Sequence, residues 1–111
     1  MTRQSYDIVV SGGGVAGLTA AAAFGGAGFS VLCVDPAPPV TARDAEGSDL
    51  RTTAMLQPAR DLLDRIGLWP RLAPHAAELQ VMRIVDAGGP APEPRVAKEF
   101  DASDISDQPF G

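Results

Sequence analysis

The feature that most constrains this chain is a glycine-rich turn between a short apolar run and an alanine-rich stretch. Ile8-Val9-Val10 precedes Gly12-Gly13-Gly14-Val15-Ala16-Gly17, and a second apolar run, residues 31–34, is followed by Asp35. This order is typical of a strand, a tight turn, a helix, a second strand and an acidic tip, the parts of a dinucleotide-binding βαβ unit. The sequence therefore predicts an α/β fold class with a parallel, Rossmann-like βαβ unit.

Each part of the turn has a physical task at a pyrophosphate. The first amides of the helix, those of Val15 and Ala16, lack acceptors, and the positive end of the helix dipole favours negative charge there. Gly12 permits the tight turn, and Gly14 lacks a Cβ, so phosphates can approach the backbone closely. Gly17 lets the helix pack tightly against the sheet. The alternative is a glycine turn without a ligand.

Asp35 lies 23 positions beyond Gly12, where a dinucleotide-binding unit places its acidic residue. Its carboxylate is predicted to accept hydrogen bonds from ribose hydroxyls and to repel a 2′-phosphate, which disfavours NADP. The alternative is a polar residue that ends a strand. These residues do not distinguish FAD from NAD as the ligand, because both bind such a unit.

Composition excludes several other classes. A chain of 111 residues forms at most one small domain, and 45% hydrophobic residues argue against disorder. The net charge of −5 without a basic stripe argues against a nucleic-acid partner. The single cysteine, Cys33, and the single histidine, His75, predict neither a disulfide framework nor a metal site, and favour a cytoplasmic protein. Residues 8–34 carry no charge, but their seven glycines favour a buried βαβ unit over a membrane span.

The predicted elements are strands at residues 6–11 and 30–35, with a helix at residues 15–27 between them. Gly28 is predicted to end that helix in a left-handed conformation. Pro58 is predicted to begin a further helix that Gly67 ends. Its apolar face is formed by Ala59, Leu62, Leu63 and Ile66, and its charged face by i,i+4 ion pairs among Arg60, Asp61, Asp64 and Arg65. Residues 81–85 and 95–100 are predicted to form a β-hairpin, with a turn at Gly88-Gly89-Pro90 between them. Residues 101–111 are polar and acidic.

Beyond these patterns, residues 7–35 resemble the flavin-dependent aromatic hydroxylases, together with Asp49-Leu50-Arg51-Thr52-Thr53-Ala54-Met55-Leu56 and a helix ending in Ile66-Gly67-Leu68-Trp69. These enzymes have the para-hydroxybenzoate hydroxylase fold. More narrowly, the sequence is similar to the ubiquinone-biosynthesis hydroxylases, the 2-octaprenyl-6-methoxyphenol hydroxylase group. Residues 79–86 and 108–111 also resemble that group. Residues 51–69 are the specific part, because generic Rossmann proteins lack them.

The resemblance implies that FAD is the cofactor and that the glycine turn binds its pyrophosphate. Asp35 matches the ribose-binding acid, which is more often Glu in the family. Arg51 matches an arginine along the FAD phosphates, a role that suits a guanidinium because it pairs with phosphate oxygens through parallel hydrogen bonds. The alternative for Arg51 is an exposed arginine before a helix. Gln57 is expected to line the flavin pocket.

The resemblance also implies an NAD(P)H-dependent flavin monooxygenase that hydroxylates a phenolic quinone precursor in ubiquinone biosynthesis. The cofactor carries that chemistry, and no residue of this chain is predicted to be catalytic. Complete members are several-fold longer, so we expect an N-terminal part, inactive alone. Residues 1–75 would belong to the FAD-binding domain, and residues 76–111 would begin the substrate-binding sheet.

Such a small chain buries little surface, so its fold is expected to be marginal or completed by self-association. Peripheral membrane association of the complete enzyme stays open. Two other readings also remain. One is part of an NAD-linked Rossmann dehydrogenase, and the other is a non-catalytic nucleotide-binding or assembly partner. Other flavoproteins that share only the first βαβ unit, such as amine oxidases and halogenases, are a further alternative.

Overall fold

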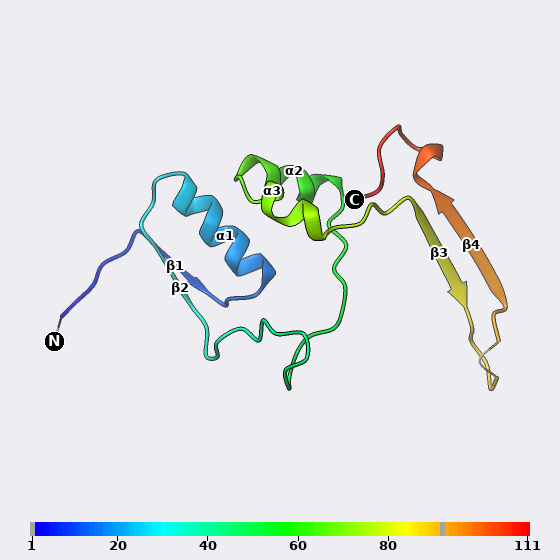
Figure 1. Ribbon diagram of the computed structural model, residues 1–111, viewed down its shortest axis with the longest axis horizontal. Helices are drawn as coiled ribbons and strands as arrows, with labels where there is room; N and C mark the ends of the chain where they lie inside the picture. The colour runs from blue at the N-terminus through cyan, green and yellow to red at the C-terminus, as the bar shows by residue number, and fades with distance from the viewer. Residues whose placement is uncertain (1, 92) are drawn as a thin grey trace. The chain divides into compact units, whose positions relative to one another are not determined.

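The structure is a computed structural model that describes residues 2–91 and 93–111. Two compact units follow one another along the chain, Met1–Thr52 and Thr53–Gly111 (Figure 1). The boundary predicted after residue 75 concerned the FAD and substrate domains of a complete enzyme, and it stays a prediction. In the described part of the chain, no helix combines the length and apolar character needed to cross a membrane.

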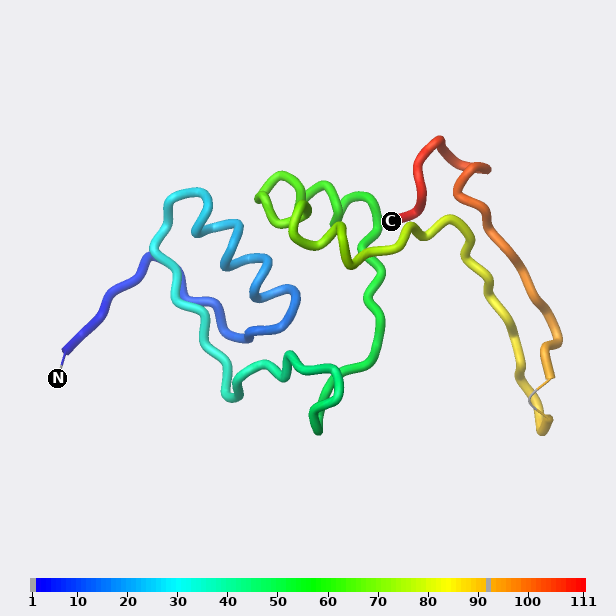
Figure 2. The backbone as a smooth tube through the Cα atoms, in the orientation of Figure 1, coloured from blue at the N-terminus to red at the C-terminus, as the bar shows by residue number. Residues whose placement is uncertain are grey.

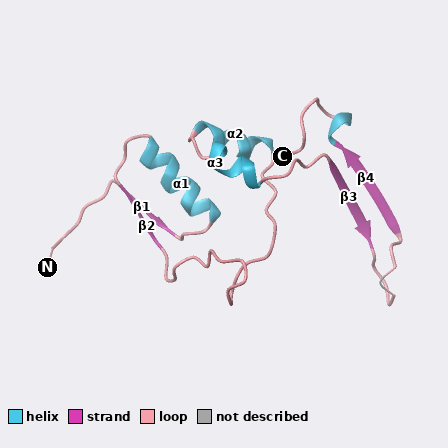
Figure 3. Cartoon of the chain, viewed as in Figure 1, coloured by secondary structure: helices cyan, strands magenta, loops and turns pink. Residues whose placement is uncertain are grey.

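The first unit is the predicted βαβ unit. Strand β1 (Ile8–Ser11) leads to helix α1 (Val15–Gly26) and then to strand β2 (Val31–Val34). The two strands pair in parallel, with Ile8 opposite Val31 and Ser11 opposite Val34. Helix α1 packs on this small sheet (Figure 3). Gly28 follows α1 with a φ of +98°, as predicted for a helix stop, because glycine adopts this conformation without a Cβ penalty.

Both strands are shorter than predicted, and side chains add to the bonding where they begin. The Asp7 carboxylate accepts hydrogen bonds from the Ser30 N–H at 2.8 Å and from the Ser30 hydroxyl at 2.7 Å. The Asp7 N–H in turn donates to the Ser30 hydroxyl oxygen at 3.0 Å. These bonds lower the pKa of Asp7, the side-chain bond from Ser30 first and its backbone bond second. They tie β1 to β2 at the end opposite the glycine turn.

The second unit contains two helices, a hairpin and two 3₁₀ turns. Helix α2 (Gln57–Arg65) is followed by helix α3 (Trp69–Leu72) and the 3₁₀ turn Ala73–His75. Strands β3 (Val81–Asp86) and β4 (Val96–Asp101) pair in antiparallel fashion and lead to the 3₁₀ turn Ala102–Asp104. The predicted hairpin is confirmed, whereas α3 and the 3₁₀ turns were not predicted.

Helix α2 buries only part of its predicted apolar face, and its charged side chains do not form the predicted pairs. Leu63 on the predicted apolar face is only 4% exposed, whereas Leu62 remains 44% exposed. The predicted i,i+4 ion pairs are wrong. The Arg60 guanidinium lies 5.2 Å from the centre of the Trp69 ring and 3.6 Å from the carboxylate of its neighbour Asp61. The Arg60 side chain therefore lies against the Trp69 ring of α3 instead of pairing with Asp64 one turn along α2.

The last residues of the chain bond to two earlier segments of the same unit. Leu79 exchanges backbone hydrogen bonds with this segment, donating to the Gly111 carbonyl and accepting from the Phe110 N–H, both at 2.9 Å. The Gln57 N–H, at the start of α2, donates to the Phe110 carbonyl at 3.1 Å. A Cβ on Gly111 would overlap the Met55 carbonyl. The red end of the tube accordingly lies beside the start of the hairpin (Figure 2). Backbone hydrogen bonds thus hold Phe110 and Gly111 against Gln57 and Leu79.

Candidate cofactor-binding site

The glycine turn leaves the end of β1 through a backbone conformation that requires glycine. Gly12 has a φ of +112°, and its N–H donates to the Val34 carbonyl at 2.7 Å. Gly14 has ordinary backbone angles and stands directly before α1. A Cβ on Gly14 would meet no atom within 4 Å. The space beside Gly14 is therefore open to a ligand, which fits the predicted approach of phosphates to the backbone.

Gly17 brings helix α1 into direct contact with the turn. A Cβ at this position would overlap the Gly12 carbonyl oxygen and reach within 3.5 Å of a Val10 methyl group. The half-buried Cys33 lies at the same place, with its thiol sulfur 3.5 Å from the Gly12 carbonyl oxygen. These contacts explain why a glycine stands in the first turn of the helix. They support the tight packing predicted for Gly17.

The N-terminus of α1 offers several hydrogen-bond donors to one place. The first helical hydrogen bond runs from the Leu18 N–H to the Gly14 carbonyl at 2.9 Å. The N–H groups of Val15, Ala16 and Gly17 precede that bond, so they lack acceptors within the helix. No side chain caps this end, and its first turn holds no acidic residue. These donors and the positive helix dipole suit an anionic group.

Asp35 lies against the turn, as its place after β2 predicts. One carboxylate oxygen accepts a hydrogen bond from the Gly13 N–H at 2.7 Å, and the other accepts one from the Ala37 N–H at 3.0 Å. The bonds from Ala37 and then Gly13 lower the pKa of Asp35. An ionised carboxylate oxygen has room for a further donor, so ribose hydroxyls can be added without breaking these bonds. The ribose contact itself stays a prediction.

Arg51 is held by a neighbour two residues away. Its Nε lies 2.9 Å from one Asp49 carboxylate oxygen, and its terminal nitrogen Nη2 lies 2.6 Å from the other. This pairing lowers the pKa of Asp49 to about 2 and raises that of Arg51. Within residues 2–91 and 93–111, no hydrogen bond or ion pair joins Arg51 to the glycine turn. The contact of Arg51 with FAD phosphates stays a prediction. The pairing of Arg51 with Asp49 was not predicted from the sequence.

Gln57 lies in the second unit, where its half-buried side chain donates from Nε2 to the Pro109 carbonyl at 2.7 Å. Together with its backbone bond to Phe110, this contact joins the start of α2 to the last residues of the chain. A hydrogen bond spanning 52 positions had no local signal in the sequence. The predicted flavin contact of Gln57 stays a prediction.

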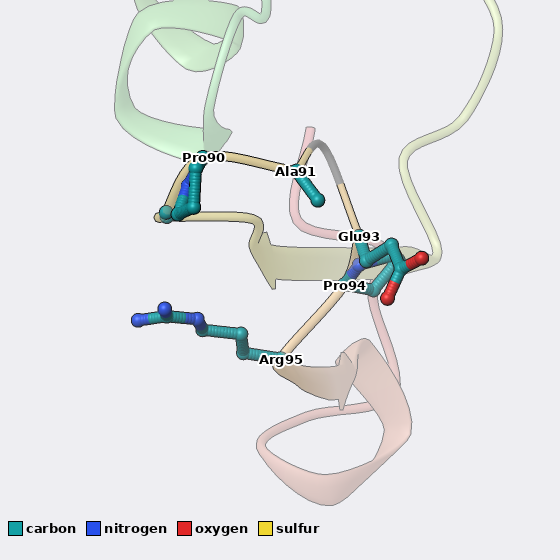
Figure 4. A pocket seen from close by; sticks show the side chains of 7 residues that line it. Pro90, Ala91, Glu93, Pro94 and Arg95 are labelled. Atoms are coloured by element: carbon teal, nitrogen blue, oxygen red, sulfur yellow. The ribbon is translucent and has the colours of Figure 1, made fainter.

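A shallow hollow of about 300 Å³ lies in the hairpin loop, lined by residues 88–91 and 93–95. The Arg95 side chain extends along one side of this hollow, while Glu93 and Pro94 lie on the other (Figure 4). None of the residues expected to bind the cofactor belongs to its lining. Among the described residues, no group of three or more His, Cys, Asp or Glu side chains is arranged to hold a metal ion.

Comparison with known proteins gives two matches. Residues 7–50 match the FAD binding domain family. A stretch of 84 residues, 76% of this chain, is 38% identical to the ubiquinone hydroxylase UbiL of Rhodospirillum rubrum, and it covers 19% of that protein. The chain thus spans about a fifth of the length of this relative. No solved structure matches. The two matches confirm the predicted resemblance to the flavin-dependent hydroxylases.

Proposed function

We propose that the chain supplies the pyrophosphate-binding part of a flavin monooxygenase. The match of residues 7–50 to the FAD binding domain family supports FAD as the cofactor of this region. The proposed substrate is a phenolic ring of a ubiquinone precursor, and NAD(P)H is the proposed reductant. The similarity to the ubiquinone hydroxylase of Rhodospirillum rubrum supports this assignment. Since the chain covers 19% of that protein, the activity is proposed for an enzyme that contains these residues.

The observation that carries the proposal is the fit of the glycine turn to a diphosphate. The unpaired N–H groups of Val15 and Ala16 stand beside the open space at Gly14. Gly17 holds the helix against the turn, which fixes these donors relative to β1. Asp35 is bonded to the turn itself, beside the place where the ribose next to the diphosphate would lie. One βαβ unit, with the residue that follows its second strand, thus presents donors for phosphate and acceptors for ribose.

The residues of this chain bind and orient; they do not carry out the reaction. The flavin, when bound, supplies the transfer of electrons from NAD(P)H to oxygen. The α1 amides would hold the diphosphate, Asp35 the ribose, and Arg51 a phosphate oxygen. No residue of the chain is assigned a proton-transfer or nucleophilic role. We propose that the chain alone does not catalyse hydroxylation.

The rival proposal, an NAD-linked dehydrogenase, uses the same βαβ unit. Binding measurements separate the two, because FAD and NAD share the adenosine diphosphate part but differ in the rest of the molecule. A chain from the flavin enzymes is expected to bind FAD in preference to NADH. The non-catalytic alternative predicts FAD binding as well, but no gain of activity when the chain is joined to the downstream coding region.

Gly14 offers a clean test of the site. Gly14→Ala places a methyl group in the open space beside the α1 amides, and its added Cβ meets no protein atom within 4 Å. Gly25→Ala is the matched control, because its Cβ also meets no atom and Gly25 lies near the other end of α1. Quenching of flavin fluorescence by the purified chain should give an FAD affinity at least about tenfold weaker for Gly14→Ala, with the control unchanged.

The experiment also has outcomes that overturn the proposal. An unsubstituted chain that takes up NADH but not FAD would exclude the flavin assignment. Equal FAD affinities for the unsubstituted chain and Gly14→Ala would exclude the glycine turn as the site. Substrate-dependent NAD(P)H oxidation by the chain alone would contradict its proposed inactivity.

A further inference from the structure

The exposed loop after β2 contains an arginine whose side chain is fixed. The first unit has three arginines in its described part, Arg3, Arg43 and Arg51. Of these, Arg51 alone makes side-chain hydrogen bonds or an ion pair within residues 2–52. Among residues 2–52, its guanidinium is therefore the one arginine group that side-chain hydrogen bonds hold in a defined orientation.

The Asp49 carboxylate holds both the backbone and the side chain of Arg51. One of its oxygens accepts from the Arg51 backbone N–H at 3.1 Å and from Nε at 2.9 Å. The other accepts from Nη2 at 2.6 Å. The carboxylate thus covers the side of the guanidinium formed by Nε and Nη2. Both side chains are otherwise exposed, that of Arg51 to 87%.

The N–H groups on the opposite edge of the Arg51 guanidinium are not engaged by Asp49 and can donate to a ligand. A guanidinium has five N–H groups, and the Asp49 carboxylate engages one on Nε and one on Nη2. Three N–H groups remain, two on Nη1 and one on Nη2, and they form a planar fork of the kind that binds phosphate oxygens. From this arrangement we infer that Asp49 is a positioning residue that holds Arg51 ready for a phosphate group of FAD. The inference rests on the proposed function, which gives Arg51 that ligand.

Two effects of Asp49 on the affinity oppose each other. Its negative charge repels a diphosphate, but water screens the repulsion because both side chains are exposed. Its direct hydrogen bonds already restrict the Arg51 side chain. Less rotamer freedom is therefore lost when Arg51 binds FAD, which favours binding. We expect the direct contact to outweigh the screened repulsion, so removal of Asp49 should weaken FAD binding.

The test is a double-mutant cycle on the full chain, with FAD affinity as the readout. Asp49→Ala should weaken FAD binding about threefold to tenfold, and Arg51→Ala about tenfold or more. In the Arg51→Ala background, Asp49→Ala should not weaken binding further, because the orienting contact is already lost and only the screened repulsion is removed. Asp44→Ala, which removes the same charge from the same loop, is the matched control and should leave the affinity unchanged.

A second measurement tests the pair without any nucleotide. The Nε–H signal of Arg51 in a nitrogen-15 NMR spectrum should stand apart from those of free arginines. It should move to their position in Asp49→Ala and stay in place in Asp44→Ala. An Arg51 signal at the free position in the unsubstituted chain would overturn the inference.

The outcomes distinguish a failure of the proposed function from a failure of the inference about Asp49. An unsubstituted chain that binds no FAD would overturn the proposed function and this inference together. FAD binding that is unaffected by Arg51→Ala would overturn the assigned role of Arg51 and therefore the inference, but not the flavin assignment. Binding weakened by Arg51→Ala but unchanged or strengthened by Asp49→Ala would overturn the inference alone.

Discussion

The contact between Gly17 and Gly12 makes a quantitative prediction for a single methyl group. In Gly17→Ala, the new Cβ would overlap the Gly12 carbonyl oxygen, which belongs to the backbone and cannot rotate away. Gly12 is itself fixed by its φ of +112° and by its bond to the Val34 carbonyl. Relief of the overlap therefore requires that α1 move away from the turn or that the turn be distorted.

The expected size of the effect follows from two opposing contributions. Overpacking of a well-packed contact typically costs about 1–3 kcal/mol, and a clash with the backbone lies at the upper end of that range. Alanine in place of glycine in a helix returns about 1 kcal/mol. We expect Gly17→Ala to lower the free energy of unfolding by about 1–2 kcal/mol and to weaken FAD binding, because the α1 amides move with the helix.

Gly25→Ala serves again as the matched control, since its Cβ meets no atom within 4 Å. It keeps the helix propensity gain without the clash and should raise the free energy of unfolding by up to about 1 kcal/mol. Urea titrations followed by circular dichroism measure both variants against the unsubstituted chain. Equal stabilisation by Gly17→Ala and Gly25→Ala would refute the close approach of α1 to the turn.

Two further predictions concern the rest of the fold. The lowered pKa of Asp7 stabilises the folded state above the unfolded value of about 4, and this stabilisation is lost as the pH falls through the lowered pKa. Ser30→Ala should therefore reduce the loss of stability seen in melts between about pH 6 and pH 3, and an unchanged pH dependence would contradict the contact. Leu63→Ala, at a buried position, should cost about 2 kcal/mol or more, whereas Leu62→Ala, at an exposed one, should cost about 0.5 kcal/mol or less, and equal costs would contradict the observed packing of α2.

The sequence was sufficient to predict the helices and strands whose sequence patterns lie within a few residues. The glycine turn, the alanine-rich helix and the apolar strands carry their patterns within a few residues, and the structure confirms them as β1, α1 and β2. Gly28 and Gly67 were expected to end helices, and both have positive φ angles. The hairpin was predicted from apolar runs and a Gly-Gly-Pro turn, and it is present.

What the sequence did not predict depends on contacts between distant or competing side chains. Arg60 had acidic neighbours at helical spacing, yet Trp69, in the next helix, offered a competing surface. Gln57 bonds to Pro109, and nothing near either residue indicates the other. Asp49 and Arg51 are close in sequence, but a chain of this composition has many such neighbours and only the geometry singles out this pair. The charged and amide side chains were therefore harder to place than the glycines.

The most direct test of the diphosphate site is an FAD titration followed residue by residue in amide NMR spectra. If the α1 N-terminus receives the diphosphate, the amide signals of Gly14, Val15, Ala16 and Gly17 will shift saturably, and those of the hairpin loop at residues 88–91 will not. Saturable binding that leaves these four signals in place, and shifts others instead, would contradict the account.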